Sequence, residues 1–194
     1  MLSSLRRSMN KLISVTLMFV LLFSFTTQVF AATKTLSVTR VTQSKDKWCW
    51  AACSEMIGTY KNSNSTRDQW DVVAYVKDSS YPNKTATSSE IEKGIKYASV
   101  DKVTYQTSSS PLSFSTTQSN IDSSNPIVVW MTWNNGEGHV VVCSGYQTSG
   151  KDEYLYLLDP ASGASSNYYD YTTMKNGITI QSGTGKYTKT IYKK

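Results

Sequence analysis

The sequence predicts an α+β fold, in which a helical N-terminal part packs on a C-terminal antiparallel sheet. Between residues 49 and 121, apolar side chains recur at helical spacing. From residue 126 onward, the apolar runs are rich in β-branched and aromatic residues and are separated by turns that contain glycine. No internal repeat or long linker interrupts this order, so we expect a single domain over residues 32–194.

The first 31 residues are predicted to be a signal peptide. Arg6, Arg7 and Lys11 form a basic segment, an apolar run follows over residues 12–25, and Val29-Phe30-Ala31 places small residues at −3 and −1 of a cut. The apolar run is shorter than the roughly 20 residues that a membrane span needs. We therefore expect a secreted, extracellular protein with no stable membrane anchor after removal of the signal.

The charge of the chain does not indicate a nucleic-acid partner. Residues 1–31 contain three basic residues and no acidic one, so their removal would lower the formal net charge from +6 to +3. The remaining Lys and Arg residues are scattered and do not gather on one predicted element. This distribution is typical of a solvated surface, and we expect a monomer that binds no nucleic acid.

The N-terminal part is predicted to contain a short strand and four helices. Alternating polarity predicts the strand over residues 35–41. The helices are predicted over residues 49–61, 68–77, 89–97 and 115–121. The second should bury Trp70, Val73 and Ala74, and the third should begin with a capping box formed by Ser89 and Glu92.

The C-terminal part is predicted to contain four strands, over residues 126–133, 140–146, 153–158 and 187–192. Trp130 and Trp133 belong to the first of these and are expected to be buried there. If the second and third strands form a hairpin around Gly150, the numbers of opposed residues sum to about 300. Asp159 would then lie opposite Val141.

The cysteine count does not indicate a disulfide framework. The chain has three cysteines, so at least one thiol is free or pairs with another chain. Cys53 and Cys143 are expected to be small buried residues, with a disulfide between them as the alternative. Because the sequence has no CxxC pair and only one histidine, we expect neither a metal site nor a cofactor.

Cys49 is the candidate nucleophile. It lies in "QSKDKWCWAAC", at the predicted start of a helix, where unpaired N–H groups and the positive end of the dipole favour a thiolate. His139, in "GEGHVVVCSGY", is the only histidine and hence the only candidate for an imidazole base. The alternatives are a structural role for Cys49 and a surface loop position for His139.

Two further residues complete a candidate site. In the hairpin register given above, Asp159 lies diagonal to His139 on one face and could accept its Nδ1–H, whereas a slip of one residue would move it to the other face. Gln43 precedes Cys49 by six residues and could supply a side-chain amide to an oxyanion. The alternatives are that Asp159-Pro160 only initiates a turn and that Gln43 is an exposed loop residue.

These motifs resemble the bacterial papain-like cysteine proteases, in the branch with a secreted plant-pathogen effector protease and the bacteriocin-processing peptidases. The resemblance extends over residues 41–163 and rests on "QSKDKWCWAAC", "GHVVVCSGY" and "LYLLDP". It implies a papain-like fold in which Gln43, Cys49, His139 and Asp159 are the functional residues and Trp50 shields the bond between His139 and Asp159. Only about a dozen residues separate the predicted cut from Gln43, so we expect no large inhibitory propeptide.

The sequence therefore predicts a secreted cysteine peptidase that acts on a peptide or protein substrate through Cys49, His139, Asp159 and Gln43. One alternative is a cell-wall peptidoglycan amidase or endopeptidase with the same site, which would release stem peptides from walls without cleaving casein. Another is a toxin-like, non-catalytic binding protein on the same scaffold, which would have no need for these four residues together.

Overall fold

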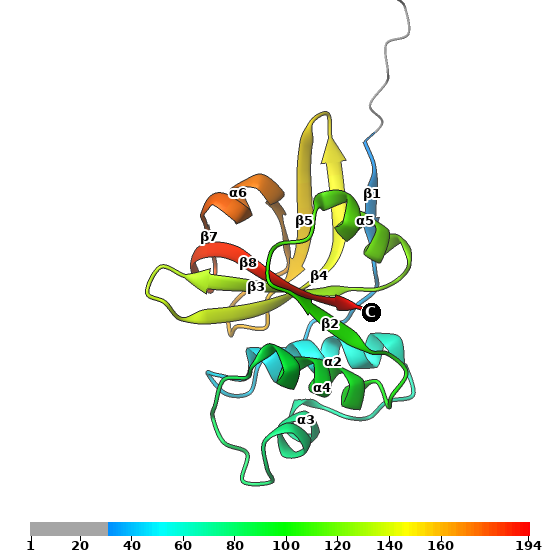
Figure 1. Ribbon diagram of the computed structural model, residues 1–194, viewed down its shortest axis with the longest axis vertical. Helices are drawn as coiled ribbons and strands as arrows, with labels where there is room; N and C mark the ends of the chain where they lie inside the picture. Colours follow the sequence, from blue (N-terminus) through cyan, green and yellow to red (C-terminus); the bar gives the residue numbers. More distant parts are fainter. Residues whose placement is uncertain (1–30) are drawn as a thin grey trace, which may run out of the picture. The chain divides into compact units, whose positions relative to one another are not determined.

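The computed structural model describes residues 31–194, so all but the last residue of the predicted signal peptide lies outside the described residues. Within the described part, the α+β architecture predicted from the sequence is confirmed (Figure 1). The helices are α2 (Cys49–Lys61), α3 (Gln69–Val76), α4 (Ser88–Ala98), α5 (Phe114–Asp122) and α6 (Tyr171–Asn176). The strands are β1 (Thr33–Thr35), β2 (Tyr105–Ser108), β3 (Ile127–Trp133), β4 (Gly138–Ser149), β5 (Asp152–Leu158), β6 (Asn167–Asp170), β7 (Ile178–Ile180) and β8 (Gly183–Lys193).

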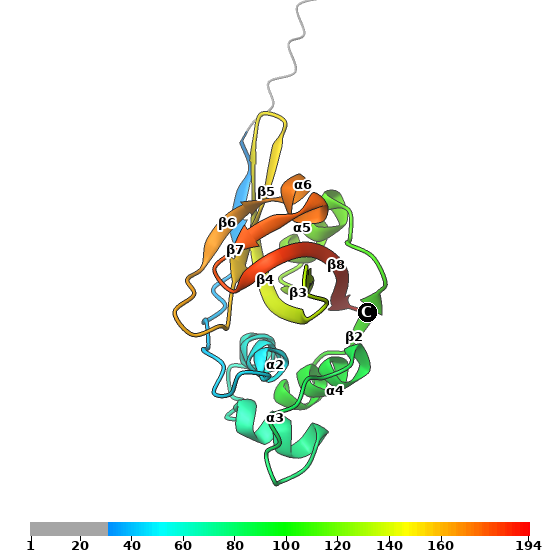
Figure 2. The same ribbon diagram turned by 90° about the vertical axis from the view of Figure 1, so that its left-hand side faces the viewer.

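The strands form one antiparallel sheet in the order β2-β8-β3-β4-β5-β6, with β1 added to β4 and β7 added to β8. Helices α2, α3 and α4 lie together on one side of this sheet, whereas α5 and α6 lie on the other, as both views show (Figures 1 and 2). Helix α2 packs directly against β4. The start of α2 and the start of β4 therefore lie where the helical layer meets the sheet.

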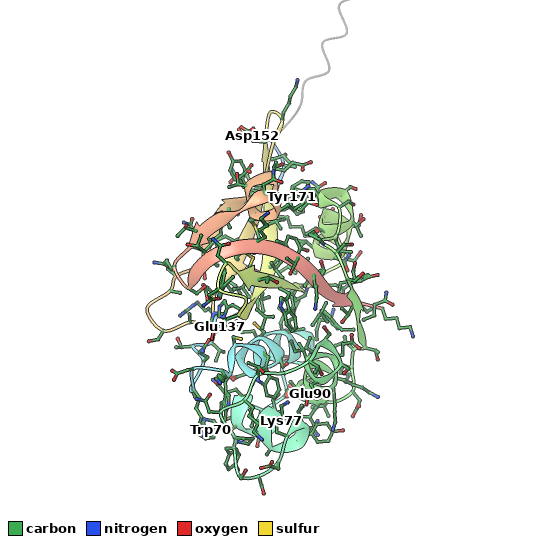
Figure 3. All side chains as sticks on the ribbon, turned by 60° about the vertical axis from the view of Figure 1, so that its left-hand side comes forward. Trp70, Lys77, Glu90, Glu137, Asp152 and Tyr171 are labelled. Atoms are coloured by element: carbon green, nitrogen blue, oxygen red, sulfur yellow. The ribbon has the colours of Figure 1, made fainter. Side chains whose placement is uncertain are left out.

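Helices α2, α3 and α4 pack closely against one another, so α3 and α4 support α2. Gly58 of α2 lies so near α4 that a Cβ atom added to it would be 2.3 Å from the Cβ of Ala98. Lys77, which caps α3, forms an ion pair of 2.6 Å with Glu90 of α4; both residues are labelled in Figure 3. A larger residue at position 58 would separate α2 from α4, because the backbone of α4 also lies within reach.

The predicted strand over residues 35–41 is wrong. Strand β1 ends at Thr35, and the following segment has no regular structure although Leu36 and Val38 are buried. The physical reason is that β1 pairs with β4 only opposite residues 145–147, beyond the stretch of β4 that pairs with β3. Alternating burial thus persists after Thr35 without a partner strand to continue the ladder.

Two details of the predicted helices also require correction. The capping box of α4 is formed by Thr87 and Glu90, and Glu92 instead accepts a hydrogen bond from Thr107 of β2. Trp70 of α3 is 39% exposed. Its ring does not enter the core but packs edge-on against that of Trp48, with the two ring centroids 4.7 Å apart. The buried face of α3 is turned one residue from the predicted one and carries Val72 and Val73.

A bulge in the β4–β5 hairpin sets the position of the chain after β5. Near the turn, Ser149 pairs with Asp152 and Gly145 with Tyr156, but beyond the irregularity Cys143 pairs with Leu157. Ser144 is therefore an extra residue on β4. Without this shift, the pairing of the turn would place residue 159 opposite residue 142, on the wrong face. With it, Asp159 follows the register that the sequence predicted.

The sequence did not predict β2, β6, β7 or α6. Strands β2 and β6 are the two edges of the sheet path, and their residues are mainly polar or half-buried. Short polar edge strands carry little of the hydrophobic alternation on which strand prediction rests. None of the helices described between residues 31 and 194 combines the length and the apolar character that a membrane crossing requires.

Candidate active site

Cys49 is the first residue of α2, as the sequence predicted, and its side chain is partly exposed. The preceding Trp48 gives the helix no side-chain cap, and the first turn contains no acidic residue. The first N–H groups of a helix have no partner within the helix and carry the positive end of its dipole. The uncapped start of α2 thus leaves donors and positive potential available to an anion at Cys49.

The two tryptophans beside Cys49 fix the start of the helix. The indole of Trp48 donates a hydrogen bond of 3.0 Å to the carbonyl of Pro82, and that of Trp50 donates one of 3.0 Å to the carbonyl of Lys84. Both rings are buried. Trp48 and Trp50 therefore position the start of α2, and Cys49 between them lines the groove.

His139 is the second residue of β4, opposite Met131 of β3, and Asp159 follows the end of β5. The Nε2 atom of His139 lies 2.7 Å from Oδ1 of Asp159, and both side chains are almost completely buried. The sequence had predicted that Nδ1 would face the carboxylate, and this is wrong. Since Nε2 faces Asp159, the nitrogen left to serve Cys49 is Nδ1.

The imidazole and the carboxylate stabilise each other's charged forms. Burial lowers the pKa of His139, but hydrogen bonds to Asp159 and to Cys49 outweigh this effect and raise the pKa to about 9. For Asp159, burial acts to raise the pKa, but the hydrogen bond to His139 and its positive charge hold the pKa below the usual value. The site therefore favours an imidazolium paired with a carboxylate at neutral pH.

Trp133, at the end of β3, covers the imidazole ring. The two rings stack with their centroids 5.7 Å apart and their planes inclined by 20°. The sequence had assigned the shielding role to Trp50 and had placed Trp133 in the core, but Trp133 is only half-buried. Met131 lies directly opposite His139, and Trp133 is two residues further along β3.

The loop before α2 is tied to the loop after β5. Arg40 donates hydrogen bonds to the carbonyls of Asp159 (2.6 Å) and Ala161 (2.8 Å), and the backbone N–H of Gln43 donates one to the carbonyl of Pro160. These contacts hold the segment that carries Gln43 against the segment that carries Asp159. Arg40 therefore positions the backbone around Asp159, a role that the sequence did not predict.

Gln43 lines the groove that contains Cys49 and His139. Its side-chain N–H₂ donates to the carbonyls of Lys45 (3.0 Å) and Asp46 (2.8 Å), so both hydrogens are engaged. The Oε1 atom is buried and has no hydrogen-bond partner among the described residues. An oxyanion role for this amide therefore requires Nε2 to exchange one of these carbonyls for the substrate oxygen.

Cavities lie on both sides of Cys49 and His139. One, of about 180 Å³, is bounded mainly by apolar groups that include Trp50, Ile91 and Trp130. The other, of about 550 Å³, is more polar, and its walls include Gln43 and Ser182. Glu137, at the edge of this second cavity, is labelled in Figure 3.

All three cysteines lie within residues 31–194 and are free thiols, so the alternative of a Cys53–Cys143 disulfide is wrong. Burial, and then the neighbouring Cys49, raises the pKa of Cys53 well above its usual value. Burial raises the pKa of Cys143 to about 12. Both are small core residues, as the sequence predicted, and only Cys49 reaches the groove. Among the described residues, no group of three or more metal-binding side chains comes together.

Comparisons with known proteins identify the family of the chain and a structure with a similar fold. The family described as "Peptidase_C39 like family" matches residues 35–188. A crystal structure of a protein classed as a C39-like peptidase, from Bacillus anthracis, has a similar fold, with a TM-score of 0.56 at 13% identity. The similarity covers 84% of this chain and 98% of that one. No curated protein matches the sequence.

Proposed function

The chain belongs to the Peptidase_C39 like family of bacterial papain-like cysteine proteases, and from this we propose that it hydrolyses peptide bonds through Cys49, His139 and Asp159. The observation that carries the proposal is the 2.7 Å contact between His139 and Asp159, made beside a free thiol at an uncapped helix start. We further propose that the protein is secreted, that it acts as a monomer, and that its substrate is a peptide or protein.

The reaction begins with the sulfur of Cys49. The imidazolium of His139 and the positive end of α2 favour its thiolate, which attacks the carbonyl carbon of the scissile bond. The carbonyl oxygen becomes an oxyanion, and the backbone N–H of Cys49 can donate to it. We assign the second donor to the side chain of Gln43, which lines the same groove.

His139 then transfers protons in both halves of the reaction. Its Nδ1–H protonates the leaving amine, and the C–N bond breaks to give a thioester on Cys49. The neutral imidazole next removes a proton from water, which attacks the thioester and releases the carboxylic acid and the thiolate. Throughout, Asp159 accepts the Nε2–H bond and keeps the ring in the tautomer that presents Nδ1 to the sulfur.

The test uses the protein expressed from residue 32 and its Cys49→Ala variant. We expect the wild-type protein to cleave casein or another unfolded protein and to react with an epoxysuccinyl inhibitor at Cys49. The variant should do neither, while its circular dichroism stays unchanged. Labelling that persists in Cys49→Ala would contradict the assignment. Release of stem peptides from purified cell walls, without cleavage of casein, would instead select an amidase or endopeptidase acting on peptidoglycan.

A further inference from the structure

Buried oxygen atoms without hydrogen-bond partners gather at the candidate active site. Five such side-chain atoms occur among residues 31–194, and three of them belong to Gln43, Asp159 and Ser182. Buried polar atoms are usually paired, so each exception calls for a physical explanation. The Oδ2 atom of Asp159 is notable among them, because Oδ1 of the same carboxylate already accepts from both His139 and the N–H of Ala161.

Ser182 belongs to the two-residue turn between β7 and β8. This turn is anchored on both sides: Gln181 accepts a hydrogen bond from the hydroxyl of Ser165 at 3.1 Å, and a Cβ atom added to Gly183 would be 2.8 Å from the indole of Trp133. Trp133 in turn stacks on His139. Through Trp133, the turn that carries Ser182 is therefore held close to His139.

Ser182 lines the larger cavity together with His139 and Ala161, and the N–H of Ala161 donates to the carboxylate of Asp159. Burial acts to raise the pKa of that carboxyl, whereas Ser182 acts to lower it, as a hydroxyl close to the carboxylate would. Neither Ser182 Oγ nor Asp159 Oδ2 has any hydrogen-bond partner in the described part of the chain. A donor and an acceptor, both buried and both unpaired, therefore face the same small space.

We propose that Ser182 is a positioning residue for the peptidase reaction: its hydroxyl donates to Oδ2 of Asp159 and fixes the rotation of the carboxylate. A carboxylate held by a single oxygen can rotate about its bond to Cβ and weaken the contact with Nε2 of His139. With Ser182 on Oδ2, and with His139 and Ala161 on Oδ1, that rotation is prevented. The order of residues in the site is then Cys49, His139, Asp159 and Ser182. This inference rests on the proposed function.

The experiment compares Ser182→Ala with Ser182→Thr, which retains the hydroxyl, and with Thr117→Val as a matched control. Thr117 also has a buried hydroxyl without a partner, but it lies on α5. Because the chain contains one histidine, its imidazole resonances report on His139 without ambiguity. The readouts are the titration of His139 by NMR, the values of kcat and KM, and circular dichroism as a check of folding.

We expect Ser182→Ala to lower the pKa of His139 by about one unit and kcat by about tenfold, with KM unchanged. Ser182→Thr should restore both, and Thr117→Val should change neither. A pKa of His139 in Ser182→Ala that equals or exceeds the wild-type pKa would overturn the inference. So would an equal shift of this pKa in Thr117→Val. The titration needs no turnover, so a protein that cleaves no peptide but shows the shift would refute the proposed function alone.

Discussion

His139 and Asp159 are 20 residues apart in the sequence, yet Nε2 of one lies 2.7 Å from Oδ1 of the other. The contact depends on the bulge at Ser144, because the register near the hairpin turn alone would place residue 159 on the opposite face of the sheet. A single extra residue on β4 thus decides whether the imidazole has a carboxylate behind it.

The first prediction concerns pH. Because the pKa of His139 is raised to about 9, the imidazolium should persist through neutral pH, and kcat/KM should fall only as the pH rises through about 9. Removing the carboxylate in Asp159→Ala removes the main cause of the raised pKa, so this descending limb should move to lower pH, and kcat at pH 7 should fall about a hundredfold. The measurement is a pH–rate profile with a fluorogenic peptide.

Asp159→Asn is the matched control for this prediction. It retains an oxygen that can accept the Nε2–H of His139 but lacks the negative charge. Its descending limb should lie between those of the wild type and Asp159→Ala. Identical profiles for all three proteins would show that Asp159 does not act on His139.

The second prediction concerns Trp133. Its indole stacks on the imidazole, and we expect it to limit the access of water to the bond between His139 and Asp159. Hydrogen bonds between charged groups weaken as the local dielectric rises. Trp133→Ala should therefore lower kcat by about tenfold, whereas Trp133→Phe, which keeps an aromatic ring, should retain most of it. Equal loss in the two variants, measured at matched circular dichroism, would point to a packing role instead.

The third prediction concerns Gln43. If its amide leaves the carbonyls of Lys45 and Asp46 to meet the oxyanion, Gln43→Ala should lower kcat by roughly 10²–10³-fold. Alkylation of Cys49 by iodoacetamide forms no oxyanion, so its rate should not change. A parallel loss of hydrolysis and alkylation would mean that Gln43 acts through the position of the thiol.

The fourth prediction concerns the three thiols. Cys53 and Cys143 are buried, and their raised pKa values keep them protonated at neutral pH. A disulfide reagent such as Ellman's should therefore titrate one thiol in the folded protein and three after unfolding. The folded Cys49→Ala variant should show none. A second rapid equivalent from folded wild-type protein would contradict the burial of Cys53 or Cys143.

The sequence contained enough information to locate the site but not to describe its interior. Helix α2 was predicted with its observed bounds, because apolar residues recur at helical spacing after Cys49. The hairpin register was predicted from Gly150 alone, although the bulge that enforces it left no local signal. These features depend on short-range patterns.

The parts that were wrong depend on three-dimensional packing. Which imidazole nitrogen meets Asp159 depends on the orientation of the ring between β4 and the end of β5. Which tryptophan covers the ring depends on the pairing of β3 with β4. No periodicity in the sequence reports either. Arg40 and Ser182 carry no signal in the sequence, because Arg40 donates to a carbonyl 119 residues later and the carboxylate proposed for Ser182 lies 23 residues earlier (182 − 159).

The described domain contains no disulfide bond, so its fold does not depend on the oxidation state of its cysteines, whereas the reactivity of Cys49 does. Reducing agents should leave the fold intact while keeping the reactive sulfur available, and mild oxidants should silence that sulfur without unfolding the chain. The protein could accordingly be stored with Cys49 blocked as a mixed disulfide, and a small thiol would release the free sulfur. In an oxidising milieu, the thiol of Cys49 would then be lost to oxidation while the folded domain persisted.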